Sequence, residues 1–287
     1  MEARSEEMDA IKNDSTSKKI ELDDYKVIIK GAGDLASGVA HRLHIAGFPV
    51  VMLELPRPLV VRRSVSFASA AFEGSVEVEG VSAQLIKEDS QIGDCWSKGI
   101  IPLLIDPEGK LLKKMKPYVL IDGVMAKRNT GTVLADAPIV IGLGPGFTAG
   151  LDVRAVVETK RGHQLGRVFY SGVAAADTGI PGDVAGVTTE RLLRAPGSGH
   201  FFPYKNIGEL VQRGEKVAAV GDIPLFASID GLVRGMLYPG LEVQKGMKVG
   251  DIDPRGGEAD WETISDKARA VGGGVLEAIM HFLVAAP

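Results

Sequence analysis

Residues 30–38 read KGAGDLASG and lie between an apolar run, YKVII (25–29), and the segment VAHRLHIAG (39–47). The apolar run is typical of a buried parallel strand, and apolar residues recur at helical spacing after the glycines. PVVMLE (49–54) predicts the next strand. A strand, a glycine turn, a helix and a second strand within about 30 residues match the size of one right-handed crossover unit. The stretch therefore predicts an α/β fold built on a parallel sheet.

Further runs extend this expectation. Three apolar runs predict additional parallel strands: IIPLLID (100–106), YVLID (118–122) and PIVIGLG (138–144). SVEVEGVSAQLI (75–86) alternates with a period of two and predicts a hairpin or edge pair. Together these segments predict a Rossmann-like parallel sheet domain over residues 25–150.

The rest of the chain differs in character. Residues 1–24 are polar and predict a flexible tail, and residues 151–205 predict a mixed α+β middle region in which TTERLLRA (188–195) forms a short helix. Residues 206–256 predict a small β region, because RGEKVAAVGDIP (213–224) is echoed by KGMKVGDIDP (245–254). Residues 257–287 predict a C-terminal helix with a glycine run.

The small β region resembles the biotinyl- or lipoyl-type hybrid barrel in ASIDGLVRGML (227–237) and GLEVQKGMKVGDI (240–252). Carriers of that type bear a lysine on the exposed hairpin between their halves, whereas here no lysine occurs between Ile223 and Gln244. The resemblance implies the fold, and we expect no covalent biotin or lipoyl group.

Composition narrows the functional classes. The 287 residues carry a net charge of −4, and no basic stripe studded with aromatic residues points to a nucleic-acid partner. Cys95 is the only cysteine, which excludes an internal disulfide and a multi-cysteine metal site, so we expect no metal. The polar first residues lack the apolar core of a secretory signal, and no apolar stretch is long enough for a membrane span. A cytoplasmic location is expected, and a homo-oligomer is left open.

The first glycine segment has the pattern G-x-G-x-x-A-x-G at a strand-to-helix junction, which favours contact between backbone and a pyrophosphate. An acidic residue 21 positions after Gly33, at the end of the second strand, is suited to ribose hydroxyls. The alternative is that the glycines serve strand–helix packing. The predicted cofactor-binding residues here are Gly31, Ala32, Gly33, Asp34, Leu35 and Glu54.

A second glycine segment, IGLGPGFTAG (141–150), follows the last predicted strand. Its free N–H groups can converge on an anion, and the ends of parallel strands share one crevice. Lys127 and Arg128, in a polar segment after YVLID, are suited to phosphate or carboxylate contacts. The alternatives are a tight exit turn and a solvated basic loop. The predicted residues of the second segment are Gly142, Gly144, Gly146 and Thr148.

Several motifs together resemble the YqeB-type family, accessory proteins of selenium-dependent molybdenum hydroxylases. They extend over about residues 25–283 and are KGAGDLASGVAHRL, LLIDP, IDGVMAKRN, VIGLGPGFTAG, VVETKRGHQLGRV, TGIPGDVAG and ERLLRAP. The family is partly similar to XdhC-type maturation factors, which have a Rossmann domain and assist insertion of a modified molybdenum cofactor. The resemblance implies an accessory protein that binds a phosphate-bearing nucleotide or molybdopterin-type cofactor at both glycine segments. It also implies a partner, a molybdenum hydroxylase or its cofactor-insertion machinery.

Two further functions are kept open. One is an NAD(P)-dependent oxidoreductase, with His200 or Asp177 as the proton-transfer group; the other is an NAD(H)-binding regulatory protein. Cys95 is a weaker candidate for a sulfur or selenium carrier, because a thiolate is the usual nucleophile for such transfer. No catalytic residue is identified from these patterns, so enzymatic activity is left undecided.

Overall fold

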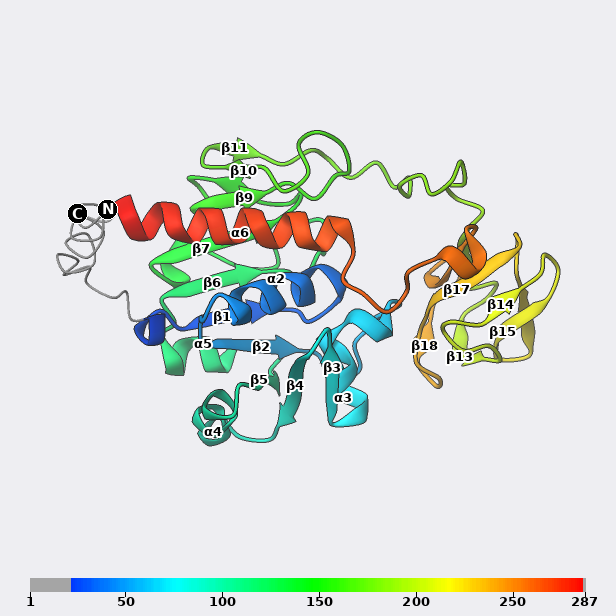
Figure 1. Cartoon of the computed structure of the whole chain (residues 1–287), viewed down its shortest axis with the longest axis horizontal. Coiled ribbons are helices and arrows are strands. Elements are labelled where there is room, and N and C mark those ends of the chain that lie inside the picture. The colour runs from blue at the N-terminus through cyan, green and yellow to red at the C-terminus, as the bar shows by residue number, and fades with distance from the viewer. Residues whose placement is uncertain (1–21, 286–287) are drawn as a thin grey trace, which may run out of the picture.

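The computed structural model describes residues 22–285, so most of the tail predicted over residues 1–24 lies outside the described part of the chain, and its residues 22–24 form the short helix η1 (Leu22–Asp24). A nine-stranded sheet forms the centre of the molecule, in the order β10-β9-β7-β6-β1-β2-β5-β4-β3 (Figure 1). Its strands are β1 (Val27–Lys30), β2 (Val50–Glu54), β3 (Ser75–Val78), β4 (Val81–Ile86), β5 (Ile101–Ile105), β6 (Val119–Asp122), β7 (Ile139–Leu143), β9 (Ala155–Val157) and β10 (Val168–Phe169).

Strand direction follows the sequence pattern. The apolar strands β1, β2, β5, β6 and β7 pair in parallel, as predicted. The alternating segment forms the antiparallel pair β3–β4, and β10 is antiparallel to β9 at the other edge. The register between β1 and β6 places Lys30 beside Asp122, each the last residue of its strand.

Helices cover both faces of this sheet. The long helices α2 (Asp34–Ile45) and α6 (Asp266–Ala285) lie side by side across one face (Figure 1). Val27 and Ile29 point into that apolar layer, whereas Ile28 packs into a second layer on the opposite side. The second layer contains α4 (Ile92–Ser97) and α5 (Lys110–Met115).

The short helical segments are connections between these elements. They are α3 (Ala70–Glu73), η1 (Leu22–Asp24), η2 (Arg63–Val65), η3 (Phe67–Ser69), η4 (Asp89–Gln91), η5 (Leu134–Asp136) and η6 (Gly256–Glu258). Within the described range 22–285, no helix combines the length and the apolar content that crossing a membrane requires.

Smaller antiparallel sheets complete the fold. Two of them have four strands each, in the orders β12-β19-β17-β14 and β16-β15-β13-β18, and one pairs β8 with β11. The strands are β8 (Thr148–Ala149), β11 (Gly172–Val173), β12 (Leu192–Arg194), β13 (Gly199–Pro203), β14 (Leu210–Val211), β15 (Lys216–Val220), β16 (Ile223–Phe226), β17 (Gly231–Met236), β18 (Glu242–Val243) and β19 (Lys248–Asp253).

The four-stranded sheet that contains β17 packs against the segment after β2. The Met236 N–H donates to the Val61 carbonyl at 2.8 Å, and the Tyr238 hydroxyl donates to the Glu73 carboxylate. Tyr238 also stacks on Phe72, with ring centroids 4.0 Å apart. These contacts join the small sheets to the large one beside the carboxyl ends of β1 and β2.

The predicted fold class, a Rossmann-like parallel sheet domain with a biotinyl- or lipoyl-like hybrid barrel, is wrong. The large sheet is mixed, with antiparallel strands at both edges, and no α-helix connects β6, β7 and β9, which are joined by loops, η5 and the short strand β8. The small β region is not confined to residues 206–256, because β12 forms an edge of one four-stranded sheet and β13 lies inside the other. The helix predicted over TTERLLRA is also wrong, since its residues 192–194 form β12.

Candidate functional site

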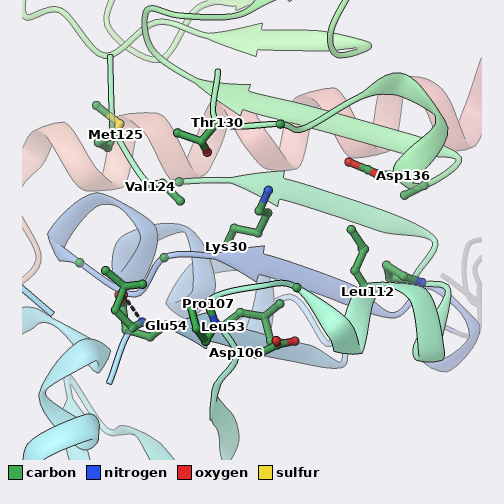
Figure 2. A pocket seen from close by; sticks show the side chains of 18 of the residues that line it. Lys30, Leu53, Glu54, Asp106, Pro107, Leu112, Val124, Met125, Thr130 and Asp136 are labelled. Carbon is green, nitrogen blue, oxygen red and sulfur yellow. Dashed lines mark hydrogen bonds between the residues drawn. The ribbon is translucent and has the colours of Figure 1, made fainter. Parts of the chain in front are cut away.

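A cleft of about 1690 Å³ opens over the second face of the large sheet and reaches the carboxyl ends of β1, β2, β5 and β6. Figure 2 shows Lys30 projecting into it between Leu112, Asp106 and Thr130. No α-helix lies between β6 and β7, and the segment after β6 leaves this part of the sheet face accessible. The carboxyl edge of parallel strands is where open α/β sheets hold ligands.

Lys30 is held by a polar pair at the floor of the cleft. Its ammonium Nζ donates to the Thr132 hydroxyl at 2.8 Å and lies 3.6 Å from Asp122 Oδ2. The Thr132 hydroxyl donates to the same Asp122 oxygen at 2.6 Å, and the Val124 N–H donates to the other at 3.2 Å. The side chain of Asp122 is 2% exposed and that of Lys30 is 22% exposed. The buried carboxylate therefore orients an ammonium group that still reaches the cleft.

Glu54 closes the first glycine turn from within. Its Oε2 accepts the Ala32 N–H at 2.7 Å, and its Oε1 accepts the Leu55 N–H at 2.7 Å. Burial raises the pKa of the Glu54 carboxyl, while the two N–H groups act in the opposite direction. Gly31 adopts φ +87°, and a Cβ there would lie 3.0 Å from the Gly123 carbonyl oxygen. The turn is thus shaped by contacts within the protein.

The side walls are polar at their ends and apolar between. Asp106 Oδ2 accepts the Leu111 N–H at 2.7 Å, which attaches α5 to the end of β5. Asp136 Oδ2 accepts the Val133 N–H at 3.0 Å and stabilises η5 on the opposite wall. The apolar lining includes Leu53, Leu112, Val124 and Met125.

The second glycine segment is filled by protein. A Cβ on Gly142 would lie 2.5 Å from the Phe147 ring, and one on Gly146 would lie 2.7 Å from the backbone of Arg128. A Cβ on Gly144 would overlap a threonine hydroxyl in the turn after β9. Glycine is required here because other parts of the chain approach closely. The alternative interpretation of this segment, a tight packed turn, is the one that the geometry supports.

The predicted site residues are therefore divided. The cleft is lined by Gly31, Gly33, Asp34, Leu35, Glu54 and Lys127. The residues outside its lining are Ala32, Arg128, Gly142, Gly144, Gly146 and Thr148. Thr148 lies in β8, where its N–H donates to Asp152 Oδ2 at 2.8 Å.

The predicted function, cofactor binding at two glycine loops by an accessory protein of a molybdenum hydroxylase, is wrong. That function required both loops to direct free N–H groups into one anion pocket, and the second loop packs on the chain itself. The NAD(P)-dependent oxidoreductase and the NAD(H)-binding regulator are also wrong. The predicted ribose-binding Glu54 is bound to backbone N–H groups of neighbouring turns, and neither predicted proton-transfer group lines the cleft with it. The predicted cofactors and the predicted hydroxylase partner are not tested by this geometry and stay predictions.

Lys30, Asp122 and Thr132 were not among the predicted site residues. The available signal was that a lysine and an aspartate each end an apolar strand, at KGAG and IDG. The contact between Lys30 and Asp122 depends on β1 and β6 being neighbours in the sheet, and the order of strands in a sheet cannot be predicted from each strand's own sequence.

Other candidate groups lie apart from this cleft. Cys95 is buried, and burial raises the pKa of its thiol, which opposes the reactive thiolate form. Neither His200 nor Asp177 lines the cleft. Among residues 22–285, no group of three or more His, Cys, Asp or Glu side chains is arranged to hold a metal ion.

Comparison of sequences gives one informative relative. No family model matches the chain. The chain is 50% identical over 257 residues to a protein of Escherichia coli (strain K12) named "Uncharacterized protein YqeB". The alignment covers 90% of this chain and 48% of that protein, so the chain spans about half the length of its relative.

Comparison of structures gives low similarity scores. A succinylglutamate desuccinylase from Silicibacter sp. TM1040 is 12% identical, with 80% and 85% of the two chains covered and a TM-score of 0.24. An aspartoacylase family protein from Mesorhizobium loti is 13% identical, with 74% and 58% covered and a TM-score of 0.23. The ectoine utilization protein EutE from Ruegeria pomeroyi is 13% identical, with 71% and 57% covered and a TM-score of 0.23. Scores of this size establish neither a shared fold nor a shared activity.

Proposed function

We propose that this chain, a member of the YqeB family by its sequence, binds a small organic acid in the central cleft with Lys30 as the cationic anchor. The observation that carries the proposal is the ammonium group of Lys30, which is oriented by Thr132 and Asp122 at the floor of the cleft. The function is stated as binding, because the cleft presents no set of groups that identifies a reaction.

The hydrogen bonding of Lys30 supports an acidic ligand. An ammonium group has three N–H donors, and one of them is used on the Thr132 hydroxyl. Asp122 lies 3.6 Å away and is itself satisfied by Thr132 and the Val124 N–H. A ligand carboxylate can therefore accept a charge-assisted hydrogen bond from Lys30.

The walls support an apolar body on that ligand. Leu53, Leu112 and Met125 line the cleft around Lys30 (Figure 2). Ligand pockets typically combine such an apolar lining with a few placed polar groups. Methionine is unbranched and adapts to irregular shapes, which suits a wall that covers an organic group.

The test uses simple acids and their esters. Benzoate and hexanoate, each beside its methyl ester, are titrated into the full chain by calorimetry and thermal shift. We expect the acids to bind and the esters to bind at least about tenfold more weakly, the effect of losing one charge-assisted hydrogen bond. Lys30→Met is expected to reduce acid binding to the level of the esters.

Lys113→Met is the matched control. Lys113 is exposed on α5 at the rim of the same cleft, so this variant removes the same charge without touching the floor. Acid binding is expected to stay within about twofold of the unmodified chain. Equal binding of acids and esters, or equal loss in both variants, would contradict an anchor at Lys30.

A further inference from the structure

A second, smaller pocket of about 330 Å³ adjoins the cleft at the start of α2 and α6. Asp34, Lys127 and Lys267 line both cavities. The second pocket also receives side chains from the turn after β9, from the segment before β12 and from β17. It therefore lies where the large sheet and the small sheets meet, and we call it the basic pocket.

The lining of the basic pocket is strongly cationic. Its carboxylates are Asp34 and Asp177. Its cations are Arg62, Lys127, Lys160, Arg161, Arg191, Arg234 and Lys267. A concave surface with this excess of one sign concentrates ions of the other sign.

Three of the arginines are paired with carboxylates that do not line the pocket. Asp266 accepts two hydrogen bonds from Arg161, at 2.5 and 2.8 Å. Asp251, which is fully buried on β19, is shared by Arg191 and Arg234. These pairs hold the guanidinium groups in place around the pocket.

Two of the pocket's arginines keep a free donor. The side chains of Arg62 and Arg191 are each 8% exposed, and the Nε of each has no hydrogen-bond partner among the described residues. The terminal nitrogens of Arg62 contact Asp34 Oδ2 at 3.4 Å and the Thr263 carbonyl at 3.2 Å. A buried N–H group that makes no hydrogen bond is energetically unfavourable.

The lysines are not balanced in the same way. Within residues 22–285, Lys127, Lys160 and Lys267 form no ion pair with a carboxylate, unlike the arginines beside them. Burial lowers the pKa of Lys267, and the nearby charges of Lys127 and Arg161 lower it further. Cations that repel one another in this way are stabilised by an anion between them.

The helix starts add to the positive field. α2 has 12 residues and α6 has 20, and both begin at the basic pocket. Gly33 precedes α2 and provides no side-chain cap, and it lines the adjoining cleft. The first N–H groups of a helix favour negative charge.

From these observations we infer that the basic pocket is a binding site for a compact, multiply charged oxyanion such as a diphosphate or tricarboxylate group. Arg62 and Arg191 belong to the cationic wall of the site, and the unpaired lysines neutralise the charge of the anion. Of the second glycine segment only Pro145 lines this site, and Lys30, the proposed anchor of the cleft, does not line it.

The carboxylates near the pocket indicate which chemical groups the oxyanion carries. Glu158 is buried at its base, but its oxygens accept the N–H groups of Thr159, Lys160 and Ala175 at 2.7 to 2.8 Å. Asp34 Oδ1 is a buried acceptor that has no partner among the described residues. The Asp34 side chain is 30% exposed, so an oxyanion with one protonated oxygen or a neighbouring hydroxyl can donate to its carboxylate while it accepts from the lysines.

The probes are inorganic pyrophosphate and citrate, titrated into the full chain by isothermal calorimetry at low and high salt. Neither probe has an apolar body for the walls of the cleft, and variants of Lys160 report on the basic pocket because Lys160 lines this pocket and not the cleft. We expect at least one probe to bind, with affinity that falls as salt rises. The double variant Lys160→Met with Lys267→Met should raise its dissociation constant at least about tenfold.

Lys87→Met with Lys98→Met is the control, because both lysines are exposed, lie near α4 and line neither cavity. It makes the same change in net charge and is expected to keep the dissociation constant within about twofold. Lys160 is exposed, so Lys160→Met alone provides a variant that folds even if the double variant does not. Absence of binding by both probes, or equal weakening in the two double variants, would overturn the inference.

Discussion

Two adjacent glycines in α6 should respond oppositely to the same substitution. A Cβ on Gly273 would meet nothing within 4 Å. A Cβ on Gly274 would overlap the carbonyl oxygen of Gly166 and lie 2.9 Å from Val157 Cγ1. Helix α6 therefore has space for a side chain at Gly273, whereas at Gly274 it packs in close contact with the turn between β9 and β10.

The magnitudes follow from helix propensity and packing. Alanine is favoured over glycine inside a helix by about 0.8–1 kcal/mol, so Gly273→Ala should raise the free energy of unfolding by roughly that amount. Gly274→Ala gains the same propensity but forces α6 away from Gly166 and Val157. Overpacking of this kind costs about 1–3 kcal/mol or more, and more is expected here because the overlap is with backbone. We expect a net loss of about 2 kcal/mol, and a difference between the variants of about 3 kcal/mol.

Urea unfolding followed by circular dichroism measures this difference. The midpoint should rise for Gly273→Ala and fall for Gly274→Ala at an unchanged denaturant slope, which shows that stability and not the unfolded state has changed. Each variant serves as the control for the other, because composition and helix position are nearly identical. Similar shifts in the same direction would refute the close contact between α6 and Gly166.

Two other substitutions test ionisable groups. Hydrogen bonds from Arg161 lower the pKa of Asp266 from 3.8 to about 2 in the folded protein. The pair therefore contributes fully to stability above about pH 4, and this contribution is lost as pH falls through about 2. Because Asp266 is 69% exposed, Asp266→Asn should lower the free energy of unfolding at pH 6 by less than about 1 kcal/mol, with the gap closing in an acid unfolding series. Burial, followed by the bond to Glu73, raises the pKa of Tyr238 to about 12, so its contribution is lost as pH rises through that value. Tyr238→Phe should remove the most alkaline step from an absorbance titration of the tyrosines and destabilise the chain by about 1–2 kcal/mol; an unchanged titration would assign that step to another tyrosine.

Local pattern was sufficient for most elements of the large sheet. The continuous apolar runs became β1, β2, β5, β6 and β7, and the alternating segment became the β3–β4 hairpin. The helix prediction over TTERLLRA was wrong because pairing with another strand outweighed the helical spacing of its apolar residues. Leu192 and Leu193 are buried where β12 pairs with β19. A partner 57 to 59 residues away cannot be detected within a short window of sequence.

The candidate sites show the same division. The sequence alone determined that Gly31, Glu54 and Lys127 lie near the carboxyl ends of strands, because a strand and the turn after it are local features. Tertiary structure alone decided that Lys30 meets Asp122 and that Arg62 and Arg191 share a pocket, since each pair is brought together by strand order and packing across long separations. The second glycine segment also shows that tertiary packing decides whether a pocket exists. Its pattern allowed a pocket, and the chain's own side chains and backbone fill that space.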